Sequence, residues 1–284
     1  MQPSQRTLFG LAMMAAAISL PAHAAQEVEV KPVDLTQFIE DVGGAERINF
    51  SGKLRMLSQR IPAAACNLTA GVDPENSRAV LKSATLEFEK IIYALEHGDE
   101  TLGIHGPEKR RKTLAAIAAL HADWDIVDQD AHAMYESEAN PELNEDIAAH
   151  DIALLEEAKL LASEINGQYS DPTAVVQADA LRIDIAGRQR MLTQKMSKEA
   201  CYILSGINVE VYKKAINGTA NMFDVSLEAL RHGMPEAGIK ASDDASINAG
   251  LDKVASHWNS LKGYLAELEA GNEWDMETLS LIHI

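Results

Sequence analysis

The chain has 284 residues, of which 46% are hydrophobic and only 5% aromatic, and its formal net charge is -18 at pH 7. A chain of this length can bury two modest cores or one large one. Nucleic acids and anionic lipid surfaces are bound through basic patches, so the negative charge argues against both as partners. Ala, Leu and Glu are abundant, and these residues favour helices over strands. The composition therefore predicts an all-α protein.

The first 24 residues have the pattern of a signal peptide. Arg6 provides a basic start, an apolar run extends from Leu8 to Leu20, and Ala22-His23-Ala24 places small residues at the cleavage positions. The run is shorter than the roughly 20 residues that a permanent membrane helix needs. We therefore expect a cleaved leader and a periplasmic protein, and a retained membrane anchor is the alternative.

One segment of the sequence occurs twice. The stretch from Asn49 to Ile61 recurs from Asp184 to Met196, 135 positions later, and Trp124 recurs as Trp258 at a spacing of 134. The spacing of 135 also relates Cys66 to Cys201, Phe88 to Phe223, Leu95 to Leu230, His97-Gly98 to His232-Gly233, and Gly103-Ile104 to Gly238-Ile239. So many matches at nearly one spacing indicate an internal duplication.

The first repeat, residues 34–168, is predicted to form four helices. Asp73-Pro74, Asn140-Pro141 and Asp171-Pro172 each place a capping side chain before a proline at the first helical position. The predicted helices are 34–68, 74–98, 108–138 and 141–167. Antiparallel helices with short connections form an up-and-down bundle. The glycine-rich segment 98–107 is predicted to be the widest turn.

The second repeat, residues 172–278, aligns with the first three helices and only the beginning of the fourth. The last six residues, 279–284, match the translation of a sequencing adapter. We therefore expect an artefact at this end and a truncated second repeat. A bundle that lacks one helix would expose an apolar stripe.

The repeated segment has two distinct faces when it is placed on a helix. An apolar face, predicted to enter the core, consists of Phe50, Leu54, Leu57 and Ile61 in the first repeat and of Ile185, Gln189, Leu192 and Met196 in the second, Gln189 being the polar departure. The other face consists of Ile48, Gly52, Arg55 and Gln59, and of Ile183, Gly187, Arg190 and Gln194.

The glycine on the second face needs an explanation, because glycine costs a helix about 1 kcal/mol relative to alanine. Close approach of another helix is the candidate reason. If the two motif helices cross at the glycines, Arg55 and Arg190 share one space. A small planar anion between two guanidinium groups would replace their repulsion with charge-assisted hydrogen bonds. Segments 47–60 and 182–198 are basic islands in an acidic chain, and Asp184 is their single acid.

The motif, with Gly52, Leu54-Arg55-Met56, Ser58 and Arg60, resembles the periplasmic P-box of nitrate and nitrite sensor kinases of the NarX and NarQ type. Both repeats are similar to the N-terminal domain of PilJ-type methyl-accepting chemotaxis transducers. The resemblance implies that two motif helices pack together and that the motif arginine binds nitrate at a two-fold axis. Carried across, the ligand-binding residues are Arg55, Arg190, Gly52, Gly187, Gln59, Gln194, Arg60 and Lys195.

Two features depart from this family. Lys195 stands at the position of Arg60, and lysine cannot present a bidentate fork. The family sensors also lie between two transmembrane helices, for which this sequence offers no candidates. We therefore expect one chain to supply both halves of the site and a membrane-bound signalling protein to receive the signal. A homodimer is the alternative arrangement.

Plainer interpretations stay open beside these. Arg55 and Arg190 would serve equally in interhelical salt bridges to some of the many acids. The whole chain would then be a helical protein-interaction module of a chemosensory or pilus-related system, with no small-molecule ligand. No nucleophile motif, phosphate loop or zinc signature occurs, so we expect no enzymatic activity, no metal and no cofactor.

The remaining paired residues carry structural predictions. Cys66 and Cys201, the only cysteines, either form a pseudo-symmetric disulfide or are two small core residues. His97 and His232 precede glycine at matching helix ends. We expect them to stabilise the helix C-termini as cationic side chains and not to bind a metal. Trp124 and Trp258 are predicted to pack in the core or between the repeats.

Overall fold

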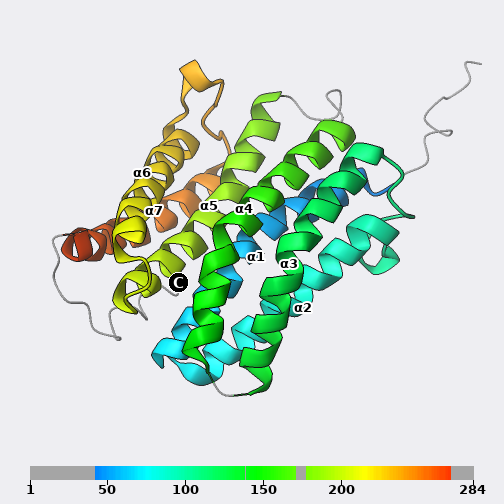
Figure 1. Ribbon diagram of the computed structural model, residues 1–284. Coiled ribbons are helices and arrows are strands. Elements are labelled where there is room, and N and C mark those ends of the chain that lie inside the picture. The colour runs from blue at the N-terminus through cyan, green and yellow to red at the C-terminus, as the bar shows by residue number, and fades with distance from the viewer. Residues whose placement is uncertain (1–41, 138, 171–176, 270–284) are drawn as a thin grey trace, which may run out of the picture. The chain divides into compact units, whose positions relative to one another are not determined.

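The computed structural model describes residues 42–137, 139–170 and 177–269. Within these ranges the chain forms helices and no strand, which confirms the all-α prediction (Figure 1). The helices are α1 (Gly44–Ala70), α2 (Pro74–His97), α3 (Arg111–Glu136), α4 (Pro141–Tyr169), α5 (Gln177–Leu204), α6 (Val209–His232) and α7 (Ala245–Glu269), with short 3-10 helices η2 (Glu100–Leu102) and η3 (Pro235–Ala237). The predicted leader, the pair Asp171-Pro172 and the segment 279–284 lie outside the described residues.

Two predicted helix starts are wrong. A single helix from residue 34 is excluded because Gly43, with φ 70°, precedes α1 in the left-handed conformation. A Cβ on Gly43 would lie 2.0 Å from the carbonyl oxygen of Gly103, so the loop after α2 also requires glycine here. The helix predicted from 108 begins at Arg111, since the carboxylate of Glu108 accepts the backbone N–H groups of Lys109 and Arg110, each at 2.8 Å.

The predicted caps had different outcomes. Asn140 accepts the backbone N–H of Glu142 at 2.9 Å, which confirms the cap at the start of α4. Asp73 makes no side-chain cap and instead adopts a left-handed conformation with φ 38°. A capping residue normally has an extended backbone, as Asn140 does, whereas Asp73 is left-handed, so that part of the prediction is wrong.

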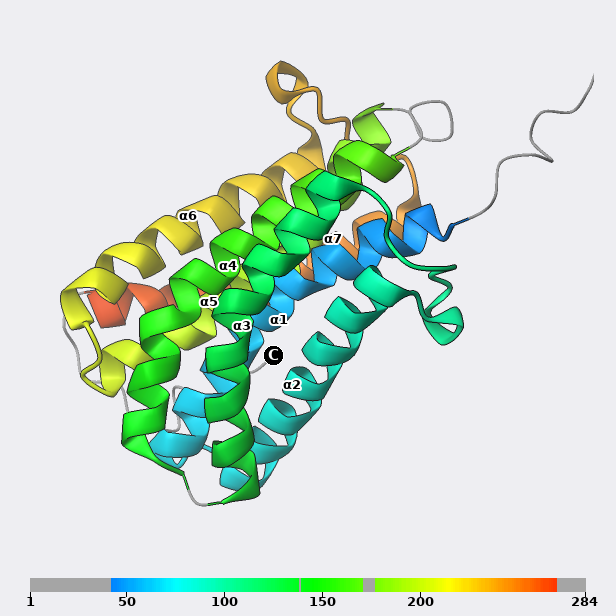
Figure 2. The same cartoon turned by 45° about the vertical axis from the view of Figure 1, so that its right-hand side comes forward.

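The first repeat forms a four-helix bundle. Helix α1 packs against α2 and α4, and α3 packs against the same two helices (Figures 1 and 2). Leu54, Leu57 and Ile61 are completely buried, as predicted for the apolar face of the motif, and Phe50 is half-buried. Trp124 is also buried and stacks on Phe88 with ring centroids 4.1 Å apart, which confirms its predicted place in the core.

The second repeat, within the described ranges, consists of α5, α6 and α7. Helix α5 packs against α6 and α6 against α7, and Trp258 is buried against Phe223 as predicted. Ile247 and Val254 on α7 are 53% and 40% exposed, whereas Thr113 and Leu120, which lie 134 positions earlier on α3, are completely buried. Helix α4 packs on α3 in the first repeat. An apolar stripe is therefore exposed on α7.

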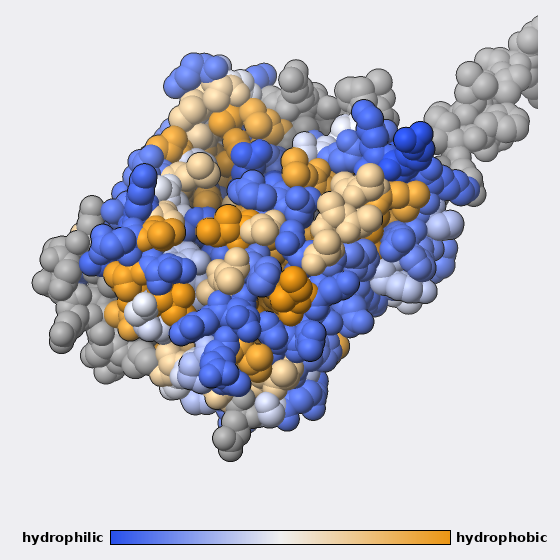
Figure 3. Space-filling model, in the orientation of Figure 1, coloured by the Kyte–Doolittle hydropathy of each residue, from blue (hydrophilic) through white to orange (hydrophobic). Residues whose placement is uncertain are grey.

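The surface carries further apolar side chains among many polar ones. Val211, Met222 and Val225, all on α6, are between 48% and 56% exposed. Figure 3 shows that apolar residues are interspersed with polar ones on the face that Figure 1 presents. None of the helices in the described parts of the chain is both long enough and apolar enough to cross a membrane.

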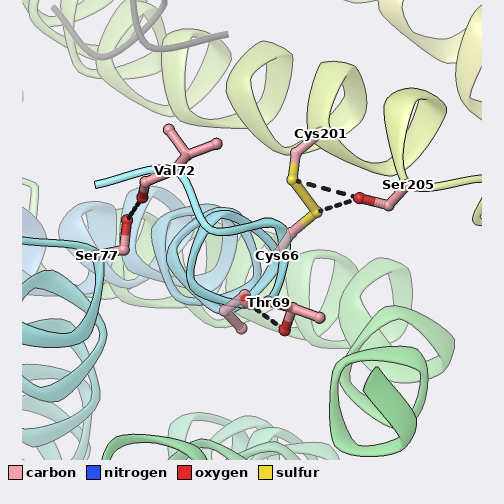
Figure 4. The surroundings of a disulfide bond; sticks show 7 residues. Cys66, Thr69, Val72, Ser77, Cys201 and Ser205 are labelled. Carbon is pink, nitrogen blue, oxygen red and sulfur yellow. Dashed lines mark hydrogen bonds between the residues drawn. A yellow bond between two sulfur atoms is a disulfide. The ribbon is translucent and has the colours of Figure 1, made fainter. Parts of the chain in front are cut away.

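The two repeats are joined along α1 and α5, the helices that carry the motif. A disulfide links Cys66 of α1 to Cys201 of α5, with both residues completely buried and their Cα atoms 6.1 Å apart (Figure 4). The hydroxyl of Ser205 lies 3.5 Å from the sulfur of Cys66. Of the two interpretations of the cysteines, the disulfide is confirmed, and it fixes the repeats to each other near the C-terminal ends of the motif helices.

Candidate functional site at the crossing of α1 and α5

The guanidinium of Arg55 lies beside both motif glycines. Its Nη2 atom is 3.5 Å from the position that a Cβ would take on Gly52 and 4.0 Å from the equivalent position on Gly187. Apart from the chain neighbours of each glycine and the nearby backbone of its own helix, no other atom of the described residues lies within 4 Å of either position. The expected reason for the glycines, close approach of the two helix backbones, is therefore wrong. An alanine at either position would make an ordinary van der Waals contact with the guanidinium of Arg55, so the structure gives no steric reason for the two glycines.

Asp184 holds this guanidinium. Arg55 Nη2 donates to Asp184 Oδ1 at 3.0 Å, and Arg188 Nη2 lies 2.6 Å from Asp184 Oδ2. The Arg55 side chain is only 14% exposed. The plainer interpretation of Arg55, an interhelical salt bridge to an acid, is thus what this structure contains. The three side chains together carry one net positive charge.

Arg190 is placed differently from its counterpart Arg55. Its side chain is exposed and makes no hydrogen bond or ion pair with the described residues. The reason lies in the motif itself, because the position of Asp184 on α5 corresponds to Asn49 on α1. A carboxylate on α5 attracts Arg55, while the neutral amide on α1 offers Arg190 no ion pair. The pseudo-symmetric pair is therefore asymmetric.

The two motif glutamines also differ. Gln59 is completely buried, and its amide nitrogen donates to the backbone oxygen of Ser58 at 3.0 Å. Its Oε1 atom has no hydrogen-bond partner among the described residues. Gln194 is half-buried. Gln189, the polar departure on the apolar face, donates to Ser226 of α6 at 2.5 Å and so belongs to the α5–α6 interface.

The second basic position does not join Arg55. Lys195 pairs with Glu199 on its own helix and donates to Thr219 Oγ1 of α6 at 2.9 Å, so its charge lies between α5 and α6. Arg60 is half-buried and forms no ion pair with any residue that the structure describes. Of the predicted ligand residues, the structure brings Arg55 together with Gly52 and Gly187.

Two further arginines of the basic islands are structural. Arg47 is buried and donates to the carbonyl oxygens of Leu95 and Gly106, at 2.8 and 2.7 Å. Arg182, its equivalent in the second repeat, donates to the carbonyl oxygen of Ala241 at 3.2 Å. Gly106 and Ala241 are themselves 135 positions apart. Both arginines therefore fasten the loop after the second helix of their repeat, a role that the sequence analysis missed.

A buried ion pair that the sequence analysis also missed joins the repeats. Lys198 of α5 pairs with Asp151 of α4, and their side chains are 2% and 0% exposed. Burial lowers the pKa of Lys198, although the charge of Asp151 opposes this shift. Tyr212 Oη lies 3.4 Å from Asp151, and burial followed by this carboxylate raises the pKa of the phenol. Lys198 therefore contributes its charge to the interior and not to an anion site.

The histidines at the helix ends lie near acids. His97 is 3.8 Å from Glu96 in the last turn of α2, and His232 is 3.4 Å from Glu228 in the last turn of α6. Over the described ranges, no group of three or more His, Cys, Asp and Glu side chains could hold a metal ion.

The fold and the motif together define a tandem helical-bundle protein whose repeats meet at an arginine-bearing helix. The family model described as the type IV pili methyl-accepting chemotaxis transducer N-terminal domain, PilJ, matches residues 40–149 and 173–277. The chain belongs to this family, which confirms the predicted relationship to PilJ and identifies a sensory or signalling module. No curated protein matches the sequence.

Proposed function

We propose that the chain is the periplasmic ligand-binding part of a sensory system and binds a small planar anion, nitrate or nitrite, between α1 and α5. Membership in the PilJ family supports the sensory role. The similarity of the motif to the P-box of the NarX and NarQ sensors motivates the choice of anion. The observation that carries the proposal is the Arg55 guanidinium, held between the two repeats beside Gly52 and Gly187.

The contact with Asp184 supports a planar anion. A carboxylate already bridges the guanidinium groups of Arg55 and Arg188. Nitrate and nitrite have the same planar arrangement of oxygens and accept the same forked hydrogen bonds from arginine. An incoming anion would take the contacts that the Asp184 carboxylate makes with Arg55, and Arg188 supplies a second cation on α5. Asp184 is therefore an internal competitor of the ligand.

The covalent link between the repeats suggests how binding becomes a signal. Because Cys66 and Cys201 fix α1 and α5 near their C-terminal ends, an anion that replaces Asp184 at Arg55 would change the spacing of the N-terminal halves. These halves precede the disulfide in both helices. A membrane-bound signalling protein would respond to that change in spacing. In this proposal the anion site lies within one chain.

Calorimetric titration with nitrate and nitrite tests the proposal, with chloride and sulfate as control anions. Arg55→Ala should weaken binding by about 1.5–3 kcal/mol, the value of a hydrogen bond to a charged group. Asp184→Asn gives α5 the amide that α1 has at Asn49, and it should tighten binding because the competing carboxylate is removed. Lys214→Ala removes an exposed positive charge on α6 and serves as the matched control.

Stoichiometry separates two arrangements of the site. One anion per chain supports the intramolecular site, and one anion per two chains places it at a homodimer axis. Equal affinity of the wild type and the Arg55→Ala variant contradicts the proposal, as does the absence of heat with any anion in folded protein.

A second candidate function is a helical protein-interaction module. The exposed apolar side chains of α6 and α7, among them Met222, Val225, Ile247 and Val254, favour it. In that case, replacement of these residues by Ser would abolish partner binding in a pull-down, and added nitrate would leave that binding unchanged.

A further inference from the structure

A pocket of about 530 Å³ opens between α2 and α3 of the first repeat, on helices visible side by side in Figure 2. Apolar surface is provided by Leu86, Ile92, Tyr93 and Trp124, and polar groups are provided by Glu89, Lys90, Glu96, His97 and His121. Trp124 is 3% exposed and forms part of the floor, while Leu86 and Tyr93 are 44% and 59% exposed at the rim. The pocket lies on other helices than the crossing at Arg55.

The second repeat shows what the equivalent groove between α6 and α7 contains. Asp224, the equivalent of Glu89, lies 2.6 Å from the ammonium of Lys262 and accepts the indole N–H of Trp258 at 2.7 Å. The Lys262 ammonium also lies 5.7 Å from the centroid of the Trp258 ring, within cation–π range. In this repeat, therefore, the chain supplies its own organic ammonium between a carboxylate and a tryptophan.

The first repeat retains the carboxylate and the tryptophan but lacks the ammonium. The position of Lys262 corresponds, at the spacing that relates Trp258 to Trp124, to Asp128. Two carboxylates, Glu89 and Asp128, therefore stand where the second repeat has an Asp–Lys pair. His132 Nδ1 lies 3.1 Å from Asp128 Oδ1 and lowers the pKa of this carboxyl, but burial outweighs it and the charge of Glu89 adds to the upward shift.

The basic residues that line this pocket, Lys90, His97 and His121, have partners other than Glu89. Lys90 lies 3.7 Å from Asp99 and donates to Thr101, so its ammonium faces the loop after α2. His97 and His121 both approach Glu96, at 3.8 and 3.6 Å. Among the described residues, no side-chain cation forms an ion pair with Glu89. The pocket thus combines an apolar floor with one carboxylate, Glu89, that no side-chain cation in the described parts of the chain pairs with.

We propose that the pocket between α2 and α3 binds a small organic ammonium ion with an apolar body. Its ammonium occupies the position that Lys262 takes in the second repeat, beside Glu89 and the indole of Trp124. Its apolar body lies against Leu86 and Tyr93. This site is separate from the anion site, and it gives a sensory module a second class of ligand.

Calorimetric titration of the full chain with 2-phenylethylammonium tests the proposal, with the neutral 2-phenylethanol as the control ligand. We expect saturable binding of one ammonium per chain and no binding of the alcohol. Glu89→Gln should weaken binding roughly ten- to hundred-fold, as expected for the loss of one charge-assisted hydrogen bond. Asp128→Lys should abolish binding, because it installs the internal ammonium that the second repeat already has.

Controls keep the test independent of folding and of the anion site. Glu145→Lys makes the same charge change on an exposed position of α4 and should bind the ammonium like the wild type. Far-ultraviolet circular dichroism establishes that each variant is folded, and nitrate titration of the Asp128→Lys variant should match that of the wild type.

Three results would overturn the proposal. These are binding retained in the Asp128→Lys variant, equal binding of the alcohol and the ammonium, and no binding of the ammonium to folded wild-type protein. The proposal would also be overturned if N-acetyl-lysine methylamide binds and 2-phenylethylammonium does not. The pocket would then take a lysine side chain of a protein partner.

Discussion

Reduction of the disulfide between Cys66 and Cys201 should remove a large part of the stability of the fold. The bond closes a loop with a sequence separation of 135 residues. The chain-entropy expression for a loop of this length gives a stabilisation of about 5 kcal/mol at 25 °C, through restriction of the unfolded chain. The bond is buried within the contact between α1 and α5, so reduction leaves the apolar packing around it in place.

Urea unfolding of oxidised and reduced wild-type protein, followed by circular dichroism, measures this contribution. Comparing two redox states of one sequence keeps the side-chain volume at the site nearly constant. With a slope of about 3 kcal/mol/M, a loss of about 5 kcal/mol lowers the midpoint by about 1.7 M. The Cys66→Ala, Cys201→Ala double variant should unfold near the reduced protein and be unaffected by reductant.

The reasoning would be refuted by a midpoint difference below about 0.3 M, which corresponds to about 1 kcal/mol. Such a result would mean that residual structure already restricts the reduced unfolded chain, so that the bond adds little.

Three further predictions concern other buried features. Lys198→Met should destabilise the fold by about 3–5 kcal/mol because it leaves Asp151 buried without a partner, and the double variant Lys198→Met, Asp151→Leu should recover most of this in urea unfolding. Gly43→Ala should lower stability by about 2 kcal/mol or more, measured by thermal unfolding, because the left-handed φ is strained and the new Cβ meets the Gly103 oxygen. Burial of Glu108 raises its pKa, but hydrogen bonds from Tyr169 and two backbone N–H groups and the charge of Arg47 outweigh burial and hold the pKa below the ordinary 4.5. Stability from this carboxylate is therefore present above pH 4.5 and lost as pH falls below it, and Glu108→Gln should flatten that part of the stability curve.

The sequence was sufficient for the features that repeat. Residues such as Leu54, Leu57, Trp124 and Trp258 fall on predictable helix faces, and their burial follows from helical periodicity. The matched positions of Cys66 and Cys201 likewise indicated a pair that the structure joins. These predictions succeeded because duplication presents the same local pattern twice.

Features that differ between the repeats could not be predicted in the same way. Asp184 was visible as the one acid of a basic island, but its partner Arg55 lies on a helix 129 positions away. Lys198 and Asp151 belong to no motif, and the position of Lys198 corresponds to Ala63 in the first repeat. Partner choice of this kind depends on tertiary packing, which single-helix patterns do not encode. The prediction that Arg190 shares a site with Arg55 failed for the same reason. Asn49 stands at the position equivalent to Asp184 and offers Arg190 no ion pair, so its side chain is exposed.

The difference between Asn49 and Asp184 has a consequence for how such a module can evolve. In a homodimer, every substitution appears twice across the two-fold axis, so an acid introduced near one arginine is also introduced near its mate. Fusion of the two copies into one chain removes that constraint. Each half is then free to change alone, and one half of an ancestral symmetric site can become a built-in competitor while the other keeps its ligand-binding chemistry.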